Sequence, residues 1–247
     1  MDKYKIKEMS WTQFDKRRKE TDTVIIPSGA CEIYGPHLPM GADGIAAEGI
    51  AELVAKRTGA LIAPMTELAD SSGLLCYPGT ITVSSKLYRL WMEELTENLI
   101  GYGFKNFLYI TGHAQNVPVI SNLAMQYQME KGIRYAQVDW WRFTAYHGDD
   151  VFDMKGTMAH GHASECGTSV MLYFRPDLVD MEKATCITPP PELFTYPDII
   201  RFVPNGLKTP NSTVGDATLG TREKGEKIVN KCVERIVEFM KSEWGVG

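Results

Sequence analysis

The chain has 247 residues, of which 44% are hydrophobic and 23% charged, and its formal net charge is −5. This length suits one large α/β domain or two small ones, and the composition is ordinary for a soluble globular protein. No basic run or strongly basic face suggests binding to nucleic acid, and the longest apolar stretches are too short to span a membrane.

Apolar patterning predicts strands that alternate with helices in the first half of the chain. The β-branched run at 23–28 ends in Pro and Ser, which is typical of a short buried strand. A helix is expected over 44–58, followed by short strands at 60–64 and 80–83. A long amphipathic helix is expected over 86–103, with its apolar side formed by Leu87, Leu90, Trp91, Leu95, Leu99 and Ile100.

The same alternation continues in the second half. Strands are expected at 107–111 and 134–141, with a helix over 117–132 between them. Further helices are expected over 165–174 and 224–244. Alternating strands and helices indicate βαβ units, so we predict an α/β fold with a mostly parallel sheet.

No linker-like segment divides the chain, so residues 1–247 are expected to form a single domain. The segment 186–220 is rich in proline and turn residues. Such a long irregular stretch could form a lid, an oligomer contact or the rim of a site.

The five cysteines are scattered and lack C-x-x-C spacing. The first twenty residues are polar and charged, without the apolar core of a signal peptide. Both features favour a cytoplasmic protein with reduced thiols.

Potential metal ligands follow three of the predicted strands. Glu32 and Asp43 lie in CEIYGPHLPMGAD after the first strand, and His113 lies in TGHAQN after the strand at 107–111. His162 and Glu165 lie in a third such loop, HGHASE. Since the carboxyl ends of parallel strands meet at one edge of a sheet, these side chains are expected to converge. Carboxylates with imidazole suit zinc, manganese or iron.

Each of these residues also has a simpler explanation. Glu32 could be a solvated loop acid, and Asp43 could cap the helix that follows. His113 alone would more often be a hydrogen-bonded loop residue than a ligand. Trp140 and Trp141 fit a core or an interface better than a substrate wall. The metal site is therefore predicted from the coincidence of three loops at strand ends.

Five blocks, taken together and in order, resemble the creatininase (creatinine amidohydrolase) family. They span most of the chain, and their combination is specific although each block alone is not. The blocks are CEIYGPHLPMGAD at 31–43, YPGT at 77–80, TGHAQN at 111–116, HGHASECGTSVML at 160–172 and GDATLGTREKG at 215–225.

The resemblance implies a three-layer sandwich with the sheet between helices, usually assembled as a homohexamer. It implies a metal-dependent hydrolase that opens cyclic amides or removes small acyl groups. Glu32, Asp43 and His113 match the ligands of one metal, and Asp43 matches the carboxylate that bridges two metals. His162 matches the histidine proposed as general acid and base.

Three positions depart from the family pattern. Tyr34 stands where the family has a second-metal histidine, Gln115 stands where creatininase has a second-metal glutamate, and Gly167 replaces the glutamate of E-T-S. Tyrosine and glutamine are poor ligands for a divalent metal. These departures indicate an altered, weakened or absent second site, so one or two metals per chain are expected, and they argue against creatinine as substrate.

One metal still supports a hydrolytic mechanism. The metal would polarise a carbonyl and activate water, and His162 or Glu165 would transfer the proton. Tyr34 could donate to the oxyanion. The substrate-binding residues expected around the metal are Gln115, Asn116, Trp140 and Trp141.

Two small-molecule substrates rank equally on the sequence, a cyclic amide and a keto-inositol-type ring. A non-enzymatic alternative is a metal-depleted family member that binds a ligand or serves in an assembly, and Tyr34 and Gln115 motivate it. Nucleotide binding is disfavoured, because the chain has neither a G-x-G-x-x-G nor a P-loop motif.

Overall fold

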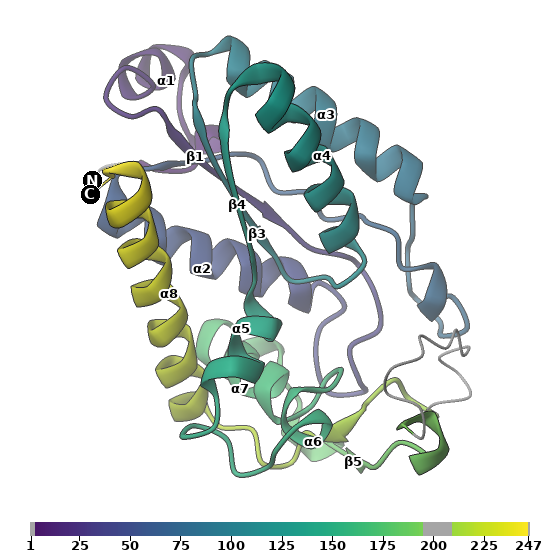
Figure 1. Ribbon diagram of the computed structural model, residues 1–247. Helices are drawn as coiled ribbons and strands as arrows, with labels where there is room; N and C mark the ends of the chain where they lie inside the picture. The colour runs from purple at the N-terminus through teal and green to yellow at the C-terminus, as the bar shows by residue number, and fades with distance from the viewer. Residues whose placement is uncertain (1–2, 195–208, 247) are drawn as a thin grey trace.

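The computed structural model describes residues 3–194 and 209–246 (Figure 1). Its main sheet has four parallel strands in the order β2-β1-β3-β4. The strands are β1 (Thr23–Ser28), β2 (Leu61–Ile62), β3 (Asn106–Thr111) and β4 (Arg134–Asp139). A separate antiparallel pair joins β5 (Cys186–Ile187) to β6 (Gly215–Asp216).

The α-helices are α1 (Trp11–Arg17), α2 (Ala42–Thr58), α3 (Ser85–Gly101), α4 (Asn116–Lys131), α5 (Trp140–His147), α6 (Thr157–His160), α7 (Glu165–Phe174) and α8 (Arg222–Trp244). Short 3-10 turns lie at Ile6–Glu8, Ser72–Leu74, Pro176–Leu178, Met181–Lys183 and Pro191–Phe194. No described helix is both long and apolar enough to cross a membrane.

Helices cover both faces of the sheet (Figure 1). Successive residues of a strand point to opposite faces. Accordingly, Ile25 packs in a cluster with residues of α2 and α8, whereas Val24 and Ile26 pack with residues of α3 and α4. The predicted α/β fold, with a parallel sheet between two helical layers, is confirmed.

Two predicted elements differ from the structure. Within 80–83 only Ile81 pairs, through a single antiparallel bridge to Cys31, so no strand forms there. The strand predicted over 134–141 ends at Asp139, and Trp140 begins a helix that sequence patterning did not reveal. Apolar residues run across this junction without a break, so periodicity could not locate the boundary.

The buried face of α3 also differs from the prediction. Tyr88, Met92, Thr96 and Leu99 face the interior. Half of the predicted apolar side is largely in solvent, because Leu87, Leu90 and Trp91 are 54%, 48% and 57% exposed. The other half contacts the interior, since Leu99 is buried and Leu95 and Ile100 pack against the core. The helix is thus rotated by about one residue, or about 100°, from the predicted orientation. The predicted irregular segment 186–220 contains the β5–β6 pair, and its residues 195–208 lie outside the described part.

Candidate metal centre

Three ligand-type side chains meet at the carboxyl end of the central strands. Glu32 comes from the loop after β1, Asp43 from the first turn of α2, and His113 from the loop after β3. All three are at most 5% exposed. These three of the side chains that were expected to converge therefore do so.

Two glycines allow the backbone to bring Asp43 into this position. A Cβ on Gly29 would lie 2.3 Å from the backbone nitrogen of Gly44, and one on Gly112 would lie 2.2 Å from the carbonyl oxygen of Asp43. Any side chain at either position would push the start of α2 away from β1 and β3. Close packing of backbone on backbone thus sets the distance between Asp43 and His113.

The three side chains have the geometry of an ion-binding set. His113 Nδ1 lies 3.3 Å from Glu32 Oε2 and 3.2 Å from Asp43 Oδ2, and the ligand atoms all lie within 4.8 Å of one another. Neither carboxylate oxygen has a hydrogen bond of good geometry in the described chain, although both are buried beside His113 Nδ1. Orphaned buried oxygens are costly, so this arrangement fits a cation between them.

The orientation of His113 also supports a cation-binding site. Its Nε2 lies 2.9 Å from the carbonyl oxygen of Asp70, which can only accept, so Nε2 carries a proton and donates it. That bond turns Nδ1 toward the two carboxylates. Metal-binding histidines are commonly fixed by a carbonyl in this way.

The closely spaced charges of Glu32, Asp43 and His113 shift the pKa values of this cluster. Burial would lower the pKa of His113, but the nearby carboxylates of Asp43 and Glu32 outweigh this effect and raise the pKa to about 11. Burial raises the pKa of Asp43 to about 6. Without a cation, an imidazolium proton balances the acids, and a divalent ion would displace it.

His162 stands beside this cluster and is held at two points. Its Nδ1 donates to the carbonyl oxygen of Ser212 over 3.0 Å, and its own carbonyl accepts from the N–H of Val214 over 2.8 Å. The other ring nitrogen, Nε2, lies 3.3 Å from Glu32 Oε1. His162 therefore presents one nitrogen to the cluster, where it can take or give a proton.

The anchoring of His162 uses strained backbone. Its neighbour Ala163 and the acceptor Ser212 have φ of 52° and 63°, and they are the non-glycine residues with positive φ in the described chain. Such conformations cost free energy and often accompany functional sites. Sequence reasoning missed Ser212, because no local pattern shows that residue 212 would reach residue 162.

Tyr34 occupies the space above Gly167. A Cβ on Gly167 would lie 2.9 Å from Tyr34 Cε1 and 3.1 Å from its hydroxyl oxygen. The tyrosine ring also packs on His162 with centroids 4.4 Å apart. Burial raises the pKa of Tyr34 well above its usual value, so the phenol stays protonated and can donate. A side chain at 167 would therefore force the ring of Tyr34 to move.

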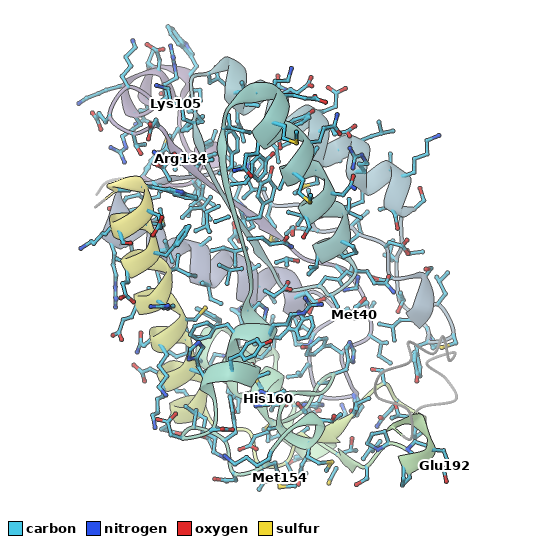
Figure 2. All side chains as sticks on the ribbon, in the orientation of Figure 1. Met40, Lys105, Arg134, Met154, His160 and Glu192 are labelled. Atoms are coloured by element: carbon cyan, nitrogen blue, oxygen red, sulfur yellow. The ribbon has the colours of Figure 1, made fainter. Side chains whose placement is uncertain are left out.

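A cavity of about 250 Å³ opens beside the cluster. Trp140, Trp141 and Gln115, which the sequence predicts to bind substrate, line this cavity. Ser71, which the sequence did not single out, and His160, the first histidine of HGHASE (Figure 2), line it as well. No lysine or arginine is among its lining residues, which are Glu32, Tyr34, Asp43, Ser71, Gly73, Leu74, Gly112, His113, Ala114, Gln115, Trp140, Trp141, His160, Gly161, His162, Cys166 and Gly167.

Glu165 lies outside this cavity, which corrects the prediction that it transfers a proton there. Its side chain is fully buried, and Oε1 accepts from the N–H of Asp153 and from Lys224 Nζ at 2.6 Å. Oε2 accepts from the N–H of Met154. Both carboxylate oxygens are thus committed to joining α7 to α8 and to the loop before α6.

Replacing Lys224 with methionine is expected to destabilise the fold by about 3 kcal/mol, because Glu165 would be left as a buried charge without its cation. Chemical denaturation measures this change. The matched control is Lys227→Met on the same helix, whose exposed pair with Asp150 should contribute much less, because solvent screens it. Equal effects of the two variants would contradict a stabilising role for the Glu165–Lys224 pair.

Asn116 is also placed differently from the prediction. It is fully buried and does not line the cavity. Its Nδ2 donates to the carbonyl oxygen of Gly29 over 3.1 Å, which ties the start of α4 to the end of β1. We therefore assign it a structural role rather than substrate binding.

Residues 7–240 match the family model for creatininase, described as creatinine amidohydrolase. The creatinine amidohydrolase of Pseudomonas putida is 27% identical, with 96% of each chain covered. The 3-dehydro-scyllo-inosose hydrolase of Thermotoga maritima is 25% identical over 94% of this chain and 81% of its own. A mycofactocin precursor peptide peptidase of Mycobacterium ulcerans is 24% identical over 88% of this chain and 85% of its own.

Solved creatininase structures share the fold. A manganese form superposes with a TM-score of 0.85 at 25% identity, covering 98% of this chain and 99% of its own. A glutamate-to-glutamine variant of creatininase in a zinc–zinc form superposes with a TM-score of 0.84. Its identity is also 25%, and the match again covers 98% of this chain and 99% of that chain.

Proposed function

The chain belongs to the creatininase family of hydrolases, and on that premise we propose that it uses a divalent metal to open a small, uncharged ring other than creatinine. The observation that carries this proposal is the pair of orphaned carboxylate oxygens of Glu32 and Asp43 facing His113 Nδ1. A protein that only bound a ligand would gain nothing from this costly arrangement.

Zinc or manganese is the proposed metal, with iron as a chemically suitable third. Two carboxylates and one imidazole suit these ions, and related creatininases exist in zinc and manganese forms. We propose one metal per chain. Within the described residues, Glu32, Asp43 and His113 are the only group of three or more such side chains that could hold an ion.

Tyr34 is proposed to replace the second metal. Its phenol fills the volume beside the cluster that a side chain at 167 would need. A buried, protonated hydroxyl can donate to an oxygen that gains negative charge in the transition state. It supplies a hydrogen bond without adding a charge.

The bound metal would polarise the scissile carbonyl and lower the pKa of water. His162 Nε2 lies beside Glu32, where it could take a proton from an attacking water and give it to the leaving group. The Ser212 carbonyl keeps the proton on Nδ1, so the imidazole presents the correct nitrogen. Trp140 and Trp141 wall the cavity, and Gln115 lies at its surface.

Both a cyclic amide and a keto-inositol-type ring fit the volume of about 250 Å³. Creatinine amidohydrolase and 3-dehydro-scyllo-inosose hydrolase support the two classes. The absence of lysine and arginine from the lining argues against an anionic substrate.

Metal removal tests the proposed reaction. The protein is dialysed against a chelator and assayed for acid release from a panel of cyclic amides and keto-inositols. Activity present before dialysis should fall to background and return with Zn²⁺ or Mn²⁺. Full activity in protein shown to be free of metal would contradict the proposal.

We also propose that the chain assembles with copies of itself, as a hexamer by family resemblance. The supporting observation is the exposed stripe of Leu87, Leu90 and Trp91 on α3. Residues three and four apart share one helix face, so the stripe is a continuous apolar surface.

Trp91→Glu is expected to dissociate the assembly, because it places a charge within that apolar stripe. Sedimentation velocity measures the change in mass. Trp11→Glu is the matched control, since Trp11 is 80% exposed on another helix. A monomeric wild-type protein, or an intact Trp91→Glu assembly, would contradict this role of the stripe.

A further inference from the structure

The cavity contains more unpaired polar groups than the metal cluster accounts for. Ser71 Oγ and the indole nitrogens of Trp140 and Trp141 are buried and have no hydrogen-bond partner in the described chain, and all three side chains line the cavity. Buried groups of this kind are rare in native proteins unless a ligand completes them. Two of them can only donate, and the serine can donate or accept.

His160 adds a hydrogen-bond acceptor to the cavity lining, because its contact with Thr144 fixes which ring nitrogen carries the proton. The hydroxyl of Thr144 donates to the carbonyl oxygen of Trp141 over 2.7 Å, which uses its one proton. The same oxygen lies 3.2 Å from His160 Nδ1 and accepts from Cys166 Sγ at 3.2 Å. A hydroxyl has one donor and two acceptor sites, so Nδ1 must be the donor here.

The other nitrogen of His160 is therefore an unprotonated acceptor. Burial lowers the pKa of His160, which keeps the ring neutral. No described residue gives Nε2 a hydrogen-bond partner, and His160 lines the cavity. The ring is held in place by Thr144 and by an edge-to-face contact with Phe152 at 5.2 Å.

A simple cyclic amide cannot satisfy this wall. It has one carbonyl, which the metal cluster needs, and one ring nitrogen, which must receive a proton from His162. Nothing then remains for Ser71, Trp140, Trp141 and His160. A substrate that pairs with them needs further groups that both donate and accept, and hydroxyl groups do this without charge. A cavity without lysine or arginine suits such a neutral molecule.

Taking the hydrolase site proposed above as given, we infer that the cavity binds a neutral, polyhydroxylated ring, and that His160 Nε2 accepts a hydrogen bond from one of its hydroxyl groups. This assigns a specificity role to His160 and favours the hydroxylated ring over the simple cyclic amide.

Isothermal titration calorimetry with three unreactive or slowly reacting probes tests this inference. The probes are myo-inositol, cyclohexanol and the simple cyclic amide 2-piperidone, and the metal content of each protein sample is measured beside the titration. We expect myo-inositol to bind more tightly than the other two. His160→Phe should weaken myo-inositol binding by about tenfold or more, as the loss of a buried hydrogen bond does.

Matched variants separate recognition from folding. His147→Phe alters an exposed histidine outside the cavity and should leave binding unchanged. Trp141→Phe keeps an aromatic wall but deletes one indole donor, so it should also weaken myo-inositol binding. It serves in place of His160→Phe if that variant does not fold.

The outcomes distinguish this inference from the proposed function. Protein that holds metal but prefers 2-piperidone to myo-inositol, or binds myo-inositol equally well after either cavity substitution, would overturn the inference alone. Protein that holds no metal yet binds myo-inositol through His160 would support the inference and contradict the metal-dependent reaction. Protein that does neither would contradict both.

Discussion

Replacing Asp43 with asparagine is expected to reduce kcat/KM by on the order of 10³-fold or more, because the site would lose an anionic ligand and with it most of its affinity for the metal. Asparagine has nearly the same shape, so the packing of α2 on β1 and β3 should survive. The measurement is kcat/KM on the best substrate of the ring panel, with circular dichroism to confirm folding.

The control for this variant is Asp150→Asn, which neutralises an exposed acid that pairs with lysines on α8. Its activity should match that of the wild type. Loss of activity in both variants would point to general instability. Retained activity in folded Asp43→Asn protein would exclude Asp43 as an essential ligand.

His162→Gln should lower kcat by roughly 10²- to 10⁴-fold, which is the usual contribution of a positioned acid or base. Glutamine keeps polar atoms near Glu32 but cannot carry a proton at neutral pH. Because His162 is absent from the set of Glu32, Asp43 and His113, metal content should be unchanged. Kinetics and metal analysis on the same sample separate these two effects.

His147→Gln is the control, since this exposed histidine lies outside the cavity. A variant at 162 that loses its metal would show that His162 is a ligand rather than a proton carrier. A variant that keeps both metal and full kcat would mean that another group moves the proton.

The convergence of the three proposed metal ligands could be predicted from the sequence because it follows from topology. Glu32, Asp43 and His113 come after parallel strands that are neighbours in the sheet, so chain order alone placed them at one edge. The predicted bounds of the helix at 165–174 match α7, which has a clear apolar face and a glycine- and serine-rich loop before it.

The direction of individual side chains could not be predicted in this way. Glu165 sits three residues after His162 in sequence, but its partner Lys224 is 59 residues further along the chain. Likewise, the tautomer of His160 depends on Thr144, and the anchoring of His162 depends on Ser212. Long-range partners of this kind leave no local pattern.

The orientation of α3 shows a different limit. Two apolar faces compete on this helix, and Leu87, Leu90 and Trp91 form the more hydrophobic of them. The structure buries the face with Tyr88, Met92 and Thr96. Hydrophobic periodicity identifies an apolar face but does not show which surface packs against it. For Leu87, Leu90 and Trp91, we propose that this surface belongs to a partner subunit.

Metal content per chain tests the central claim most directly. Wild-type protein, purified without added metal or chelator and then reconstituted with Zn²⁺ or Mn²⁺, is analysed by inductively coupled plasma mass spectrometry beside Asp43→Asn. The account predicts about one equivalent in the wild type and almost none in the variant, from the single three-residue ligand set. Two equivalents would show that Tyr34 does not replace a second metal, and no metal after reconstitution would contradict the hydrolase mechanism itself.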